Sequence, residues 1–158
     1  DIVGLLELKL KYHHKGDIKV IYSMADTKHY IPMPEIPGEK DFNPYYMMLK
    51  MDINKPLYIC NHILCIVNYQ QDGMTSRVLQ SYEECPVSYA MLREAYLEHQ
   101  EIPCMFAYRQ CIHYVSSWIF AKRQKKKVNS LWRRKLVWMA VIPGVILNMW
   151  VRWKNRRH

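Results

Sequence analysis

The final 37 residues, Lys122 to His158, constrain the fold most, because they carry twelve Lys or Arg and no Asp or Glu. They enclose an uncharged stretch of 16 residues, Leu136 to Val151 (LVWMAVIPGVILNMWV). The first 121 residues carry 11 Lys or Arg and 14 Asp or Glu, so the net charge of +9 comes from this terminus. A segment that is basic, then apolar, then basic needs anions around its ends and little water around its middle. Membranes and ribonucleoprotein particles both meet this need.

The uncharged stretch is short for a membrane span, but its flanks lengthen it. At ~1.5 Å per residue it gives ~24 Å of helix, whereas a hydrocarbon core of ~30 Å takes about 20 residues. Lys135 and Arg152 can extend their charges toward the headgroups, and Pro143-Gly144 is tolerated in membrane helices. Indole rings favour the membrane interface, and four of them bracket the stretch in two pairs: Trp132, Trp138, Trp150 and Trp153.

We therefore predict a single transmembrane, or membrane-embedded, helix over residues 136–153. The alternative is a helix buried in protein or RNA, which normally keeps a polar face. Asn148 is the only strongly polar side chain of the stretch. A variant of the membrane prediction pairs this helix with the apolar segment Cys104 to Ala121 as a two-helix hairpin.

The basic residues are predicted to bind anionic lipid or phosphate, and in the alternative to bind RNA. Eight lie before the apolar stretch and four after it, so the positive-inside rule places the N-terminal region on the matrix or cytoplasmic side. The predicted ligands of anions are Lys122, Arg123, Lys125, Lys126, Lys127, Arg133, Arg134, Lys135, Arg152, Lys154, Arg156 and Arg157.

The N-terminal two-thirds of the chain is predicted to contain a small antiparallel sheet. Residues 5–12 (LLELKLKY) alternate apolar and charged, which is typical of a half-buried strand, and residues 18–24 would return as its hairpin partner. Residues 57–69 and 76–82, separated by the turn signal Asp72-Gly73, predict a second hairpin. Between them, residues 30–56 contain five Pro and predict an extended connector, with a helical turn or two at 45–51.

Helices are predicted beyond Pro86. Ser88 can cap a helix that runs to about Gln100, and Pro103 can start an apolar helix over 104–121. The predicted fold class is α+β, with five segments: a small α+β region over 1–103, the apolar helix 104–121, a basic linker 122–135, the transmembrane helix 136–153 and a basic end 154–158.

No catalytic residue, cofactor site or metal site is predicted. The chain lacks P-loop, dinucleotide-binding, G-x-S-x-G and H-E-x-x-H motifs. Cys60, His62 and Cys65 have a spacing that places two side chains on one face of a strand and the third on the other, which suits a tetrahedral metal site poorly. The five Cys favour buried thiols over a disulfide framework. Because the first residue is Asp, any targeting peptide cannot be read and we expect a processed or partial chain.

In layout, residues 104–158 resemble the small accessory subunits of mitochondrial inner-membrane complexes. The resemblance implies a non-catalytic subunit of a respiratory or ATP synthase complex, with other subunits and anionic phospholipid as partners and its N-terminal region in the matrix. The alternative is an organellar ribosomal protein whose basic C-terminal tail binds RNA.

Overall fold

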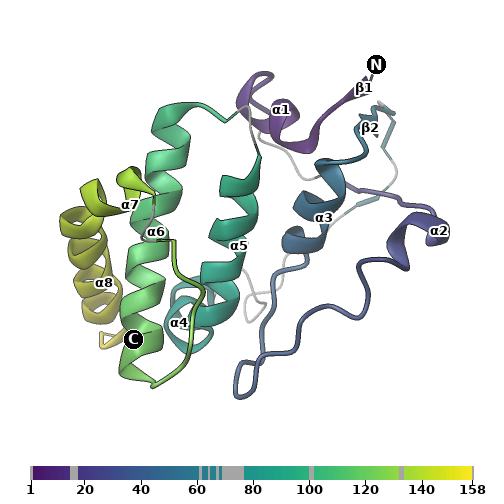
Figure 1. Cartoon of the computed structure of the whole chain (residues 1–158). Helices are drawn as coiled ribbons and strands as arrows, with labels where there is room; N and C mark the ends of the chain where they lie inside the picture. The colour runs from purple at the N-terminus through teal and green to yellow at the C-terminus, as the bar shows by residue number, and fades with distance from the viewer. Residues whose placement is uncertain are drawn as a thin grey trace. The chain divides into compact units, whose positions relative to one another are not determined.

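The computed structural model is mainly helical (Figure 1). It describes residues 2–14, 18–60, 62–63, 65–66, 68, 77–99, 102–131 and 134–157. The chain forms two compact units, each assembled from two segments. Unit one consists of Asp1–Pro34 with Pro44–Gln71, and unit two of Glu35–Asn43 with Asp72–His158.

Unit one holds short elements: β1 (Ile2–Val3), α1 (Leu5–Leu10), α2 (Met24–Thr27), α3 (Tyr45–Asp52) and β2 (Leu57–Tyr58). Strands β1 and β2 pair antiparallel, with Ile2 opposite Tyr58. The carboxylate of Asp52 caps α1, because it accepts hydrogen bonds from the backbone N–H groups of Leu5 (2.6 Å) and Leu6 (3.3 Å). These N–H groups have no acceptor within the helix itself.

Unit two is a set of packed helices: α4 (Val78–Glu84), α5 (Pro86–Glu98), α6 (Cys104–Arg123), α7 (Lys135–Met139) and α8 (Val141–Asn155). Helix α6 lies between α5 and α8 (Figure 1). Its buried residues, among them Cys111, Tyr114 and Val115, form a core with residues of α5, α7 and Ala140. A smaller cluster joins Tyr82, Phe120 and Val151 at the α4 end.

The chain leaves α6 through a Schellman motif. Lys125 has a positive φ of 58°, the N–H of Lys126 donates to the carbonyl of Ala121, and the N–H of Lys125 donates to that of Lys122. The following segment then runs back along the unit, because the buried hydroxyl of Tyr114 donates to the carbonyl of Asn129 and accepts from the N–H of Leu131. The basic linker is thus folded against the helices.

The predicted α+β class is wrong for the described residues. Residues 5–10 form α1 in place of a strand, since capping by Asp52 and burial of both Leu5 and Leu6 outweigh the alternation. Residues 18–23 have no regular structure, and residues 78–84 form α4 where the second hairpin was expected. The turn residues Asp72-Gly73 and most of the 13–17 turn lie outside the described residues.

Three helix predictions are confirmed. The helix expected from Ser88 is α5, although it begins at Pro86 and Ser88 lies in its first turn. The apolar segment 104–121 is α6, and the turn or two at 45–51 is α3.

The predicted C-terminal helix is broken into α7 and α8 at Ala140. Pro143 supplies the reason: it has no N–H to donate to Met139, so it is accommodated only in the first turn of a new helix. Gly144 does not serve as a membrane kink, because it lies against α6. A Cβ atom at this position would stand 2.6 Å from the Cβ of Val115 and 3.1 Å from the carbonyl oxygen of Ile112.

Among the described residues, no helix combines the length and the apolar character that crossing a bilayer requires. The predicted transmembrane or membrane-embedded helix over 136–153 is therefore wrong. The predicted location in the mitochondrial inner membrane depended on that helix and is therefore also wrong.

Candidate interaction face

Helices α7 and α8 present a continuous row of exposed apolar side chains on one side. Ile142 is 74% exposed, Ile146 61% and Met149 62%, although each would favour burial by about 1.5–3 kcal/mol. Spacings of three and four residues keep the row on one helix face. We call this row the α7–α8 stripe: Trp138, Met139, Ile142, Val145, Ile146, Met149, Trp150 and Trp153.

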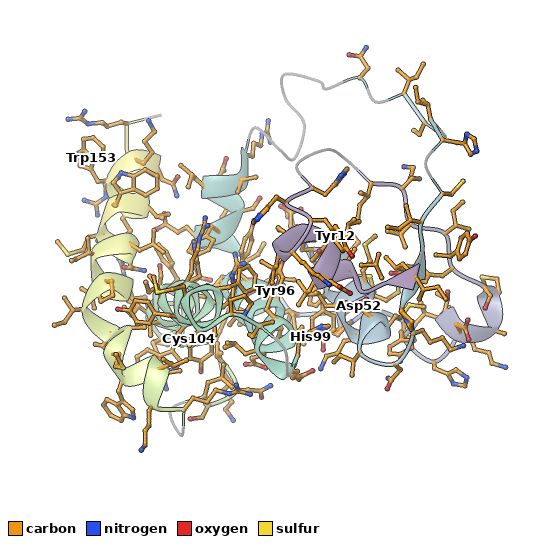
Figure 2. The ribbon with its side chains drawn as sticks, turned by 90° about the horizontal axis from the view of Figure 1, so that it is seen from above. Tyr12, Asp52, Tyr96, His99, Cys104 and Trp153 are labelled. Atoms are coloured by element: carbon orange, nitrogen blue, oxygen red, sulfur yellow. The ribbon has the colours of Figure 1, made fainter. Side chains whose placement is uncertain are left out.

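The opposite face of α8 is buried and determines the direction in which the stripe is exposed. Gly144, Asn148 and Val151 are buried there, and the amide of Asn148 donates to the carbonyl of Ser116 on α6 at 3.1 Å. Near its end, Asn155 donates to the carbonyl of Leu79 and to the carboxylate of Glu83. Because these polar contacts fix the rotation of α8, the stripe faces away from α6. Figure 2 labels one of its residues, Trp153, on the outer side of α8.

Charge is confined to the two ends of the stripe. No charged residue occurs between Leu136 and Val151. No acidic side chain of the described residues forms a salt bridge with the basic groups at either end. The guanidinium of Arg157 lies 4.0 Å from the ring centre of Trp153 and extends the stripe. Among the described residues, the basic groups are Arg134 and Lys135 at one end and Arg152, Lys154, Arg156 and Arg157 at the other.

One predicted anion ligand, Lys126, is instead a structural residue. Its ammonium lies 3.0 Å from a carboxylate oxygen of Glu39, and the two side chains are 19% and 1% exposed. The same carboxylate accepts from the backbone N–H groups of Val87 (2.9 Å) and Ser88 (2.8 Å) and from the Ser88 hydroxyl (2.6 Å). Glu39 thus caps α5 and joins three separate chain segments of unit two.

Sequence reasoning missed Glu39, and no local pattern marks it. Residues 39, 88 and 126 are far apart in the chain and belong to none of the motifs that spacing can identify. The one available signal was the lack of an Asp, Asn or Thr immediately before Pro86, which leaves the first turn of α5 in need of a distant acceptor.

The other predicted ligands divide by location. Lys122 lies over the ring of Trp118, at 5.3 Å from its centre. Arg123 is exposed at the last position of α6, and Lys125 and Lys127 are exposed beyond it. Trp132 and Arg133 lie outside the described residues. The predicted basic residues are therefore not gathered into one site.

A second cluster of cationic groups lies at the junction of α4, α5 and α6. Arg93 of α5 donates to the side-chain oxygen of Gln110 at 3.1 Å, and the hydroxyl of Tyr82 lies 3.3 Å from Nδ1 of His113. Burial, together with the positive charges of Arg93 and Arg109, lowers the pKa of His113 from 6.5 to about 4. His113 is therefore neutral at pH 7.

The cysteine and histidine residues of the discounted metal motif lie in unit one. Cys60, His62 and Cys65 line a cavity of about 550 Å³, together with His14 and apolar side chains. Within the described ranges, no three His, Cys, Asp or Glu side chains are grouped so that they would hold a metal ion.

No family model matches the chain, and neither the curated proteins nor the solved structures include a match to it. Function is therefore inferred from the residues and their geometry.

Proposed function

We propose that the chain is a non-catalytic subunit of a larger protein assembly and that it binds a neighbouring subunit through the α7–α8 stripe. The observation that supports this is the stripe itself, a row of eight large apolar side chains held outward by the packing of α8. Exposed apolar patches of this extent typically mark an interaction site. Other exposed apolar residues are scattered: Ile21 and Ile66 lie in irregular segments, and Met105 lies near the start of α6.

The positions of the basic residues indicate what kind of surface the partner has. From Trp138 to Trp153 the stripe is about 22 Å long at ~1.5 Å per residue, with basic groups only at its ends. An apolar groove with carboxylates near both ends would match it. A second copy of this chain would not, because antiparallel or parallel pairing of two such stripes would bring Lys and Arg against Lys and Arg.

The same pattern favours a protein groove over a lipid surface or RNA. A helix that lies in the plane of a membrane carries Lys and Arg along its polar face, whereas both edges of this stripe are uncharged between Leu136 and Val151. RNA would offer phosphates to the basic ends but no apolar counterpart to Ile142 and Ile146. The ribosomal alternative therefore explains the charge and leaves the stripe unexplained.

Photo-crosslinking from the stripe tests the proposal. A photoreactive amino acid is placed at Ile146 in the full chain, expressed in the native cells, and the adduct is identified by mass spectrometry. Met149→Asp is compared with Met105→Asp, since both side chains are exposed (62% and 77%) and only Met149 belongs to the stripe. We expect a single protein adduct that Met149→Asp reduces at least tenfold and Met105→Asp does not.

The proposal also requires that the partner, once identified, binds the purified chain with the same dependence on Met149. Its crosslinked peptides should come from a groove with carboxylates at both ends. Adducts that consist of lipid, of RNA or of a second copy of this chain would overturn it, as would a protein adduct to which Met149→Asp makes no difference.

A further inference from the structure

The cationic cluster at the α4–α5–α6 junction has no role in the proposed partner binding, and the described residues give its guanidinium groups no ion-pair partner. Arg109 and His113 are four residues apart on α6 and so lie on the same face. The hydrogen bond from Arg93 to Gln110 places a second guanidinium beside that face. Neither Arg93 nor Arg109 forms a salt bridge with an acidic side chain in the part of the chain that the structure describes.

Arg93 also has an unused donor. Its Nε atom is buried and has no hydrogen-bond partner among the described residues. A buried donor without an acceptor destabilises the fold, and a bound ion is one of the explanations for such a group. The exposed Arg109 leaves the cluster open on one side.

The groups packed around the cluster are aromatic or hydroxyl groups, and one carboxylate, that of Asp41, lies on the Tyr89 side. Tyr82 of α4 donates its hydroxyl hydrogen to the carbonyl of His113 at 2.8 Å, and Tyr89 of α5 packs against Tyr82. The carboxylate of Asp41, which acts on Tyr89, accepts a hydrogen bond from the Ser81 hydroxyl. Among the described residues, the charges that act on His113 are the two guanidinium groups, and an anion bound there would offset them.

We propose that Arg93, Arg109 and His113 form a binding site for the phosphate group of a small molecule. Guanidinium groups suit phosphate because their donors match its oxygens in geometry and in charge. The imidazole contributes through Nε2, because Nδ1 faces the oxygen of Tyr82, whose own hydrogen is used by the His113 carbonyl. Phosphate binding is then coupled to proton uptake at Nε2.

This coupling gives the test. The imidazole signal of His113 is followed by NMR as a function of pH, with inorganic phosphate or with sodium chloride at equal ionic strength. Without phosphate the pKa of His113 is about 4, and an anion at Nε2 favours the charged imidazole. We expect saturating phosphate to raise this pKa by at least one unit, which corresponds to at least tenfold tighter phosphate binding by the protonated form.

Three variants distinguish a specific site from general attraction of anions to a basic chain. Arg109→Gln removes a neighbouring positive charge, so it should raise the pKa of His113 without phosphate and abolish its response to phosphate. Arg123→Gln removes one charge from the exposed far end of α6 and should change neither value. Arg109→Lys keeps the charge and should retain part of the response.

A response equal in chloride and phosphate would overturn the proposal, because it would show ionic screening alone. So would an equal loss of response in Arg109→Gln and Arg123→Gln, or no response in the wild-type chain. Met149→Asp should leave the phosphate response unchanged, so this site and the α7–α8 stripe fail or succeed separately. Acetate in place of phosphate should give a smaller shift, since it offers fewer oxygens to the two guanidinium groups.

Discussion

Replacing Glu39 with Gln should strongly destabilise unit two. The carboxylate is 1% exposed and accepts three hydrogen bonds from Val87 and Ser88 besides its ion pair with Lys126. A glutamine would lose the charge and turn its NH₂ group toward groups that are themselves donors. Lys126, only 19% exposed, would keep its charge without a counter-charge.

The magnitude follows from burial. Breaking a buried ion pair by removing one partner costs about 3–5 kcal/mol, whereas an exposed pair contributes about 0–1 kcal/mol. Glu39 is buried and Lys126 mostly so, which indicates a loss of about 3 kcal/mol. With a urea slope of about 2 kcal/mol per M, the unfolding midpoint should fall by about 1.5 M.

Urea unfolding of the full chain, followed by circular dichroism, measures this loss. Lys126→Met tests the other partner, and Lys127→Met is its matched control, since Lys127 is exposed in the same segment and should change stability by less than about 0.5 kcal/mol. The double variant Glu39→Gln/Lys126→Met should be more stable than the sum of the single losses by at least about 1 kcal/mol. The reasoning is refuted if Glu39→Gln costs under about 0.5 kcal/mol, or if Lys126→Met and Lys127→Met behave alike.

Two further predictions concern α6. Gly144→Ala should destabilise the chain by about 1–3 kcal/mol, because the added Cβ would stand 2.6 Å from Val115; urea unfolding measures it, and full stability of Gly144→Ala would contradict the close packing. The pKa of His113 is about 4 in the folded chain, compared with 6.5 for an ordinary histidine. Between these pH values the unfolded chain binds a proton that the folded chain does not. The free energy of unfolding should therefore fall as the pH drops from about 6.5 to about 4. His113→Gln should flatten that part of the pH profile, and an unchanged profile would show that His113 titrates normally.

The helices of unit two were predictable because local signals and packing agree there. Pro86 and Pro103 mark the starts of α5 and α6, and the apolar residues that follow recur at helical spacing. The strand predicted at residues 5–12 is wrong because the alternation of apolar and charged residues does not by itself determine the structure. Burial of the adjacent pair Leu5 and Leu6 is incompatible with one buried strand face, and the capping carboxylate that favours the helix is 47 residues away.

The uncharged stretch was wrongly predicted to span a membrane, and only one of its faces is buried. Its sequence contained the signal for packing: Gly144, Asn148 and Val151 recur at intervals of four and three and form the face that α6 covers. Small and polar residues on one helix face favour close contact with another helix. Composition alone cannot show that this face packs on α6 while the opposite face remains exposed.

The basic residues have two separate roles, and this separation bears on how the stripe would bind. Lys126 is neutralised within unit two, so it adds no attraction for a partner. The charges that remain at the stripe are unequal, with three basic groups in the sequence at the Arg134 end and four at the Arg157 end. Apolar contacts supply affinity but accept either direction of a partner segment, whereas unequal end charges favour one direction over the other. The stripe thus combines an apolar surface that binds with terminal charges that orient what is bound.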